Sequence, residues 1–581
     1  MKNPIWQLSK KTWRYSKGNR KGVVLYIALQ IIANTINFFQ PLVLAWLLNI
    51  IQEQGVTQQN IPQLLWIASL FIAITLGFWT FHGPARVLER KNAFIARANY
   101  RKYLVDGTMD LPLAWHTDHH SGDTIDKIEK GSTALYDYAG HTFEIIQTIL
   151  QLISSYLALT WFNLHSAYIV AFIVIATVTI ILRFDEYLRK QYRQLFKYEN
   201  KITAKIFDSI SNITTVIILK LESVVSKEIW KKIMAPFGLY KKNVKINELK
   251  WFLTSLCTAL MAFFVIGTYI YTNKNGAVLV GTVSALYGYV QRINQLFFRF
   301  AFRYGEFVRM HSAVENSEEL SGAFESRKKV KQVKLDKWKK LQIDQLTFNY
   351  GDKDGELHLD NISLEIKKGE KIALVGESGS GKTTFMKLLR ALYPAKKAKV
   401  TLDGKKLKSL ESVKNNITLI PQEPELFATT VEENITLGIP YPKKEVLTYS
   451  KMAMFDKVAK RLPSGYESSI VEKGVNLSGG EKQRLALARG LIAASDKPIV
   501  LMDEPTSSVD SKNEIEIYKH VFKAFKGKTI ISSIHRLHML NMFDRIYLFK
   551  RGRIVARGTL EEMMQNAEFK PLWKKYTSSL K

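Results

Sequence analysis

The segment 376–383 (GESGSGKT) constrains the fold of this chain more than any other part of the sequence. It follows the apolar run 372–375 and precedes the helix-like run 384–392, so the order is strand, glycine-rich turn and helix. In such a turn the glycines let backbone N–H groups approach an anion closely, and the helix adds its positive N-terminal end. We therefore predict a phosphate-binding loop formed by Gly376, Glu377, Ser378, Gly379, Ser380, Gly381, Lys382, Thr383 and Thr384.

Two side chains of this loop carry specific expectations. Lys382 is expected to reach the β- and γ-phosphates of ATP, and the Thr383 hydroxyl is expected to ligate Mg²⁺. A glycine-rich turn without a ligand is the alternative for the bare pattern, and the flanking strand and helix argue against it.

Polar residues follow three further apolar runs, at the positions where open α/β sheets place their ligands. One run ends in Asp503, which can hold Mg²⁺, and in Glu504, which can deprotonate an attacking water. A second run ends in His535, which can contact the γ-phosphate, and a third is followed by Gln422. A solvated strand end explains each residue alone, but their occurrence together in this order predicts one catalytic site.

Residues 477–484 read LSGGEKQR, which resembles the signature motif of the ABC-transporter ATPase family. The similarity extends to single positions elsewhere. It implies that Tyr350 stacks on adenine, that Gln422 is the lid glutamine with a place in catalysis and Mg²⁺ binding, and that His535 is the switch histidine. Further matches are Glu472 and Gly474 ahead of the signature, and residues 507–510 (SSVD) after the acidic pair.

The same resemblance implies that the signature faces the nucleotide of a second subunit. Ser478, Gly479 and Gly480 lie at a predicted helix start, where backbone N–H groups form another anion site. ATP between two such surfaces would join two copies of the chain, or this chain and a related partner. The departures from the family pattern remove no catalytic group: Glu481 stands where Gln is common, and Ser508 and Val509 replace Ala and Leu.

The charge of the chain points to a polyanionic surface. The formal net charge of +31 suits nucleic acid or an anionic membrane, and six apolar runs favour membrane lipid, so we expect no nucleic-acid partner. The single cysteine, Cys257, excludes a disulfide framework and a cysteine-rich zinc site. Segment 5–21 interleaves aromatic and basic residues and is expected to form an amphipathic helix on the inner membrane face, with a basic cytosolic tail as the alternative.

Six apolar runs are candidate membrane spans. The connectors after the first, third and fifth runs are short and carry few charges, whereas those after the second and fourth are long and rich in Lys and Arg. By the positive-inside rule both termini and the ATP-binding part are cytosolic, in a multi-pass protein of the plasma (inner) membrane. Apolar core helices of a soluble protein are the alternative. The predicted spans are residues 23–51, 61–83, 143–161, 167–182, 251–272 and 276–298.

The fold class that follows is an α-helical six-span transmembrane domain and then an α/β P-loop ABC-type nucleotide-binding domain. We place the first at residues 1–325, a basic linker at 326–340 and the second at 341–581. In the family that the chain resembles, each inner connector carries a short transverse helix that docks on the ATPase. Residues 121–128 resemble the first such helix, and residues 206–219 are expected to hold the second.

A group of His and Asp residues beside the first predicted transverse helix resembles a metal-ligand set on composition. Adjacent histidines cannot easily share one helical face, so we interpret the group as a structural polar turn, with a metal site as the alternative. Its members are His116, Asp118, His119, His120 and Asp123.

Polar stripes on three of the predicted spans favour a substrate cavity. Polar groups facing lipid are costly, so these faces should point at one another or at water, and interhelical hydrogen bonding alone is the alternative. Glu144 lies near the cavity edge and Arg292 toward its inner end, unless both reach the headgroups. The stripes are Gln30, Asn34 and Asn37, then Glu144, Gln147, Gln151 and Ser154, and finally Tyr287, Gln291, Asn294, Gln295 and Phe298.

Spans followed by an ATPase resemble the exporter-type ABC half-transporters over essentially the whole chain. The resemblance implies ATP hydrolysis coupled to export of an amphiphile, peptide, drug or lipid by a dimer with alternating access. Uptake, or an ATP-gated pore on the same scaffold, is the first alternative. A non-transporting ABC ATPase that acts on ribosomes or DNA is the second, and the membrane spans argue against it.

Overall fold

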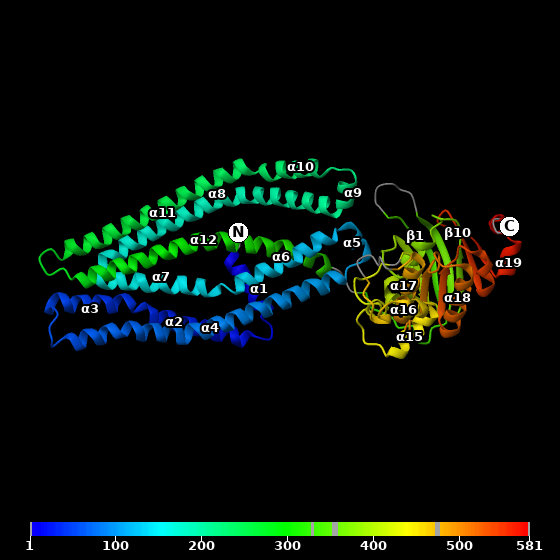
Figure 1. The fold of residues 1–581 in the computed structure, drawn as a ribbon, viewed down its shortest axis with the longest axis horizontal. Helices are drawn as coiled ribbons and strands as arrows, with labels where there is room; N and C mark the ends of the chain where they lie inside the picture. Colours follow the sequence, from blue (N-terminus) through cyan, green and yellow to red (C-terminus); the bar gives the residue numbers. More distant parts are fainter. Residues whose placement is uncertain (1–2, 327–329, 351–357, 424, 471–476, 579–581) are drawn as a thin grey trace. The chain divides into compact units, whose positions relative to one another are not determined.

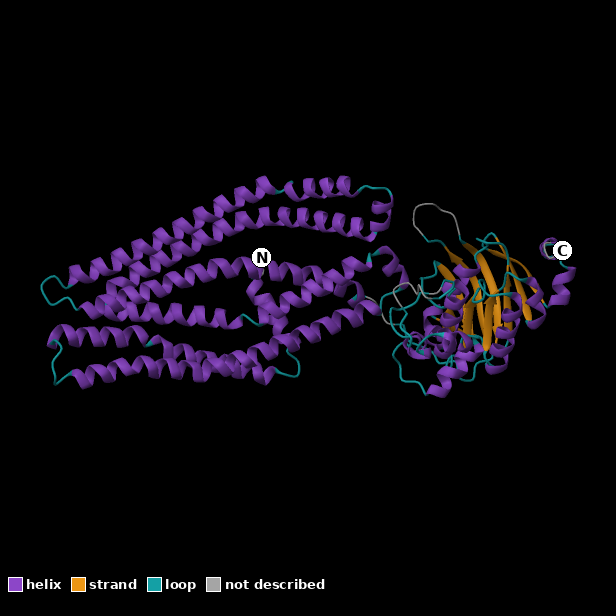
Figure 2. Cartoon of the chain, viewed as in Figure 1, coloured by secondary structure: helices purple, strands orange, loops and turns teal. Residues whose placement is uncertain are grey.

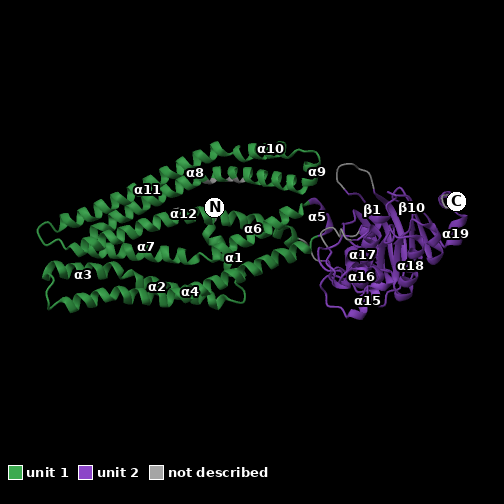
Figure 3. Ribbon diagram, in the orientation of Figure 1, with its two compact units in different colours: residues 1–111, 119–326 green, residues 112–118, 327–581 purple. Residues whose placement is uncertain are grey.

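In the computed structural model the chain forms two compact units (Figure 3). The first contains residues 1–111 and 119–326, and the second contains residues 112–118 and 327–581. The structure describes residues 3–326, 330–350, 358–423, 425–470 and 477–578.

The first unit is a bundle of long helices (Figures 1 and 2). Long apolar runs become helices because a helix satisfies every backbone polar group within its own segment, as a bilayer requires. α2 packs on α4, α8 packs on α11, and α12 contacts α3, α6 and α7. The helices are α1 (Pro4–Tyr15), α2 (Arg20–Phe38), α3 (Gln40–Gln54), α4 (Ile61–Met109), α6 (Ser121–Ala139), α7 (Thr142–Phe162), α8 (Leu164–Ser211), α9 (Ile213–Ile218), α10 (Glu222–Met234), α11 (Phe237–Thr272) and α12 (Val280–Glu325).

Within the described residues, five helical stretches are long and apolar enough to cross a membrane. They contain the first five predicted spans and lie at Arg20–Gln54, Ile61–Met109, Ser121–Phe162, Leu164–Ser211 and Glu222–Thr272. The sixth predicted span falls mostly in α12, where Gln291, Arg292 and Gln295 dilute the apolar residues. The predicted count of six spans therefore stays a prediction.

The N-terminal helix is amphipathic, as predicted. Leu8 and Tyr15 of α1 are buried, and α1 contacts α4, α6 and α12. Trp6 on the same helix is 70% exposed. The helical part of this prediction is confirmed, and its place on the membrane face remains an expectation.

The first predicted span is broken in the structure. α2 and α3 meet at a break because Pro41 has no N–H to donate to the carbonyl oxygen of Asn37. Side chains of α12 donate to the carbonyls at this break. Arg292 Nη2 donates to the Asn37 oxygen over 3.0 Å, and the Tyr289 hydroxyl donates to the Phe38 oxygen over 3.2 Å. Arg292 thus ties α12 to the break in the first span.

We expect Arg292→Leu to lower the free energy of unfolding by about 1–3 kcal/mol, because it leaves carbonyl acceptors without their donor. The measurement is the thermal unfolding midpoint of the purified protein in lipid. Arg183→Leu, which removes an exposed arginine of α8, is the matched control and should leave the midpoint unchanged. Equal shifts in the two variants would contradict this role for Arg292.

Each long inner connector holds a six-residue helix. α9 lies inside the predicted range 206–219, so that expectation is confirmed for the helix itself. The first expectation is wrong in position, because the short helix is α5 (Leu113–Asp118) and residues 121–128 begin the long α6. No proline interrupts residues 121–139, so the helix that starts there continues to Ala139. α5 belongs to the second compact unit.

The His and Asp group lies around this same turn. His116 and Asp118 are in α5, and Asp123 is in the first turn of α6. Among the residues that the structure describes, no three His, Cys, Asp or Glu side chains are close enough together to hold a metal ion.

The polar stripe of α2 lies between helices. Gln30 and Asn34 are buried, and Gln30 Oε1 is 3.3 Å from Nδ1 of His82 on α4. This contact is the interhelical hydrogen bonding that was the alternative to a cavity for the first stripe.

The second unit is built on two sheets (Figure 2). The six-stranded sheet has the order β10–β9–β3–β8–β7–β6, in which β10 is antiparallel to β9 and the other neighbours are parallel. Because parallel strands end at the same edge, the residues after β3, β6, β7 and β8 meet there. These strands are β3 (Lys371–Val375), β6 (Ile417–Ile420), β7 (Ile499–Asp503), β8 (Thr529–Ser533), β9 (Arg545–Lys550) and β10 (Arg553–Gly558).

The second sheet is antiparallel with the order β2–β1–β4–β5. Its strands are β1 (Lys340–Phe348), β2 (Leu359–Lys367), β4 (Lys397–Leu402) and β5 (Lys405–Leu407). The other helices of this unit are α13 (Lys382–Leu389), α14 (Val431–Thr436), α15 (Lys443–Met452), α16 (Asp456–Arg461), α17 (Gly479–Ala493), α18 (Ser511–Ala524), α19 (Leu560–Gln565) and α20 (Lys570–Ser578), with 3-10 turns η1 (Leu410–Asn416), η2 (Gly465–Glu467) and η4 (Leu537–Met542).

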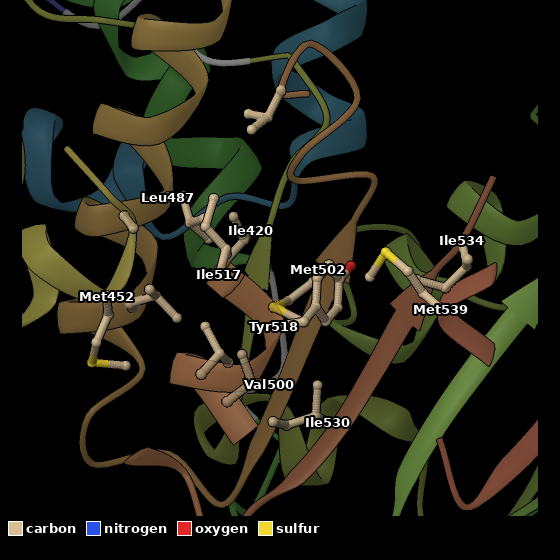
Figure 4. Close-up of a cluster of buried hydrophobic side chains, with 14 of the residues drawn as sticks. Ile420, Met452, Leu487, Val500, Met502, Ile517, Tyr518, Ile530, Ile534 and Met539 are labelled. Atoms are coloured by element: carbon tan, nitrogen blue, oxygen red, sulfur yellow. The ribbon is translucent and has the colours of Figure 1, made fainter. Parts of the chain in front are cut away.

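A buried apolar cluster joins the six-stranded sheet to α17 and α18 (Figure 4). Met502 and Ile530 from the strands are buried in this cluster, as are Leu487 of α17 and Tyr518 of α18. The Tyr518 hydroxyl lies 2.6 Å from Ser532 Oγ on β8. Burial of each such apolar side chain contributes about 1.5–3 kcal/mol to the free energy of folding. The cluster holds in place the strands that carry the predicted catalytic residues.

Candidate nucleotide-binding site

The predicted phosphate loop connects β3 to α13, as the sequence pattern requires. Three of its glycines, Gly376, Gly379 and Gly381, have φ of +152°, +77° and +106°, which side chains disfavour. A Cβ on Gly376 would lie 2.3 Å from the backbone oxygen of Phe549, so the close approach also requires glycine. Glu377, Ser378 and Gly379 are exposed on the loop, and the backbone leads into the α13 N-terminus, where an anion is favoured.

Lys382 is buried at the base of this loop. Its Nζ donates to the carbonyl oxygens of Gly376 over 2.8 Å and Glu377 over 3.0 Å. Burial lowers the pKa of Lys382, while the charges of Glu504 and Asp503 act to raise it. The ammonium is thus held rigidly where the loop turns, between the phosphate cradle and the two carboxylates.

Asp503 ends β7 and is buried. Ser533 of β8 donates a hydrogen bond to Asp503 Oδ1 over 2.8 Å. Burial raises the pKa of Asp503, and hydrogen bonds from Thr383 and Ser533 partly oppose that shift. The Thr383 hydroxyl and the Asp503 carboxylate together form a hard oxygen donor set, which fits Mg²⁺. Ser533 was missed in the sequence, although it ends β8 two residues before His535.

A raised pKa of Asp503 predicts that the affinity for Mg²⁺ depends on pH. Below its pKa the carboxyl carries a proton that Mg²⁺ must displace, so affinity should fall by up to roughly tenfold per pH unit as the pH drops, and the fall should begin at a higher pH than for an exposed aspartate. The check is the Mg²⁺ concentration for half-maximal ATPase activity as a function of pH. Asp496→Asn, an exposed carboxylate, should keep the wild-type profile, whereas an unchanged profile in Asp503→Asn would contradict the assignment.

Glu504 follows β7 and is held through both its backbone and its side chain. Its φ of +45° places a non-glycine residue in the left-handed region, which costs about 1–3 kcal/mol and is typical of functional positions. Its backbone N–H donates to Ser533 Oγ over 2.8 Å, and its Oε2 accepts from Gln422 Nε2 over 2.7 Å. His535 Nε2 contacts Glu504 Oε1. The structure therefore gathers Gln422, Glu504 and His535 from three strand ends.

Tyr350 lies beside the start of α13. Its hydroxyl is 3.3 Å from Thr384 Oγ1, and its exposed ring meets Phe348 and Tyr393 edge-on. An exposed ring near the phosphate loop is available for stacking on a base.

The signature residues Ser478, Gly479 and Gly480 lie at the start of α17. Ser478 is the N-cap, and it forms a capping box with Glu481 in which each residue accepts from the backbone of the other. Partial burial acts to raise the pKa of Glu481, but hydrogen bonds from Ser478 and Arg461 lower it overall. Glu481 therefore caps the signature helix. A glutamate at this position can fill the capping role that a glutamine would also fill, so the departure from the family pattern is accommodated. Glu472 and Gly474 lie outside the described residues.

Gln483, which the sequence interpretation did not single out, links three parts of the site. Its Nε2 donates to Ser507 Oγ over 2.7 Å and to the Gln422 carbonyl oxygen over 3.3 Å. Its Oε1 accepts from the Ser508 N–H over 2.7 Å. The signature helix is thereby bonded to the SSVD loop and to Gln422. The sequence signal that could have identified Gln483 was its position inside the LSGGEKQR motif.

Two family models match the chain. The model described as "ABC transporter" matches residues 359–507, and the model described as "ABC transporter transmembrane region" matches residues 23–296. The chain belongs to the ABC transporter family. The observed order, a helical membrane unit followed by a sheet-containing ATPase unit, is the exporter half-transporter arrangement that the sequence predicted.

Several ABC proteins are similar to this transporter. The multidrug resistance-like ATP-binding protein MdlB of Buchnera aphidicola (subsp. Acyrthosiphon pisum, strain APS) is 26% identical over 572 residues, which cover 96% of each chain. A putative multidrug export ATP-binding/permease protein of Staphylococcus aureus (strain NCTC 8325 / PS 47) is 29% identical over 65% of this chain and 66% of its own. A solved bacterial Atm1-family ABC exporter with ATP bound shares the fold, with a TM-score of 0.83, 22% identity, and coverage of 96% of this chain and 98% of the other.

Proposed function

We propose that two copies of this transporter form an ATP-driven exporter. The ATPase units would bind ATP between them, and the helical units would open a cavity alternately to the two sides of the membrane. The observation that carries this proposal is that Gln422 and His535 both contact the Glu504 carboxylate. The same chain also contains helices long and apolar enough to cross a membrane. The similar proteins whose names include multidrug export or ABC exporter support the direction of transport.

In the proposed reaction, the phosphate loop binds ATP and Lys382 neutralises its β- and γ-phosphates. Glu504 accepts a proton from the attacking water, and His535 holds the carboxylate and approaches the γ-phosphate. Thr383, Asp503 and Gln422 would hold Mg²⁺, which supplies further charge neutralisation when bound. Most of the catalysis then comes from positioned charges rather than from a covalent intermediate.

The signature motif is the part of the chain through which a second copy would contribute to the nucleotide site. Ser478, Gly479 and Gly480 present the N-terminus of α17, and among the described contacts the Ser478 hydroxyl bonds only within that helix start. We infer that this anion-binding helix end completes the nucleotide site of the other copy. Gln483 would transmit the presence of that nucleotide to Ser507 and Gln422. A homodimer is sufficient, and a related partner chain would fit the same surfaces.

Transport into inverted vesicles tests the proposal. The purified protein is reconstituted in proteoliposomes, and ATP with Mg²⁺ is added outside, where the outward-facing ATPase units can use it. An exporter accumulates a fluorescent amphiphile in the lumen against its gradient, and the same vesicles without Mg²⁺ do not.

Two outcomes would contradict export. Loss of preloaded amphiphile that needs ATP would indicate uptake, and equilibration without accumulation would indicate an ATP-gated pore. Protein that remains a single copy with ATP and Mg²⁺ present would contradict the shared nucleotide site.

A further inference from the structure

A cavity of about 590 Å³ lies in the first unit, lined by side chains of α7, α11 and α12. Its apolar wall consists of four aromatic residues. Trp251 and Phe298 stack with ring centroids 4.9 Å apart and planes within 3° of each other, so the two rings pack face against face. Phe143 and Phe302 complete that wall. Flat aromatic walls suit a planar ring system or an acyl chain.

The acidic residue of this cavity is already neutralised. Arg303 donates from Nε to Glu144 Oε2 over 2.6 Å and from Nη2 to Glu144 Oε1 over 2.8 Å, which is a bidentate pair. The remaining end of the guanidinium, Nη1, donates to Glu306 Oε2 over 2.6 Å. Both Glu144 and Arg303 therefore have their charges committed within the protein.

Arg299 is different. It lies one helical turn before Arg303 on α12, is exposed, and lines the same cavity. In the part of the chain that the structure describes, no hydrogen bond or ion pair engages its guanidinium. The cavity thus combines an aromatic wall with one uncommitted positive charge.

We propose, on the basis of the export function above, that this cavity selects amphiphiles with an anionic head. The aromatic or acyl body would lie on Trp251 and Phe298, and a carboxylate, phosphate or sulfate would pair with Arg299. A cationic amphiphile fits less well, because Arg299 repels its head and the acidic side chain of the cavity, Glu144, is already paired. Freeing Glu144 from a bidentate arginine leaves that arginine without its partner, which is strongly unfavourable in a partly desolvated site.

Three pyrene probes of one carbon skeleton test this selection: pyrenebutanoate, pyrenebutanol and pyrenebutyl-trimethylammonium. Each is titrated into the full-length protein in phosphatidylcholine nanodiscs, and binding is read from energy transfer from tryptophan to pyrene. Partition into protein-free nanodiscs is subtracted. We expect the wild type to bind the butanoate about tenfold more tightly than the ammonium probe, the effect of one charge-assisted contact.

The variants assign the preference to one residue. Arg299→Gln should remove most of the tenfold preference, and Arg299→Lys, which keeps the charge, should retain it. Arg183→Gln removes an exposed arginine of α8 that does not line the cavity, and it should retain the preference. The inference is overturned if the wild type binds the ammonium probe as tightly as the butanoate, or if Arg183→Gln loses the preference to the same extent as Arg299→Gln.

Failure of this inference is separable from failure of the export proposal. The wild-type comparison of the three probes needs no substitution and no ATP. If the protein pumps a neutral or cationic amphiphile into inverted vesicles but shows no preference for the butanoate, export stands and anion selection is rejected.

Discussion

Glu504→Gln is expected to lower the rate of ATP hydrolysis by roughly 100- to 10,000-fold while ATP binding persists. Glutamine keeps the size and one acceptor of the carboxylate, but it cannot take a proton from the attacking water. The structure holds this carboxylate between Gln422 and His535, so its removal leaves the rest of the site in place. The measurements are phosphate release and retention of labelled ATP in one preparation.

The same variant should accumulate in a closed, ATP-bound form. If ATP joins the two ATPase units and hydrolysis separates them, a site that binds without turnover stays shut, which spin-label distances between the two copies can show. Glu516→Gln is the control, since Glu516 is a partly exposed carboxylate of α18 that pairs with Lys519 over 2.9 Å. Normal turnover by Glu504→Gln would show that another group is the base.

Lys382→Ala is expected to weaken ATP binding by roughly 10- to 100-fold, since hydrogen bonds to charged groups contribute about 1.5–3 kcal/mol. The substitution removes the positive charge at the phosphates, and it also removes the donor to the carbonyls of Gly376 and Glu377. Part of any effect could therefore arise from distortion of the loop. Equilibrium binding of a fluorescent ATP analogue measures the affinity.

Lys528→Ala separates these two causes. Lys528 also has a pKa lowered by burial and also donates to two main-chain carbonyls, those of Ala494 and Ser495. Its loss should lower stability in a similar way without changing ATP affinity. A comparable loss of affinity in both variants would assign the effect to folding rather than to the missing charge.

The sequence predicted the class of the fold and the composition of the candidate site. Apolar runs of sufficient length predicted the helical unit, and the glycine spacing of residues 376–383 predicted the turn between β3 and α13. The polar residues after apolar runs predicted that Gln422, Asp503 and Glu504 would meet at one sheet edge. All of these are local patterns, in which the residues that determine the structure are close together in the chain.

Other features were decided only by tertiary structure. The sequence did not show that Ser533 bonds both Asp503 and the Glu504 backbone, or that Arg303 neutralises Glu144. It placed the first short helix in residues 121–128, although α6 continues through them. The glycine turn of the phosphate loop and the helical state of the apolar runs follow from the conformational limits of neighbouring residues, so the sequence determines them by itself. Pairing between side chains on separate elements depends on how those elements pack, and only the folded chain brings such partners within hydrogen-bonding distance.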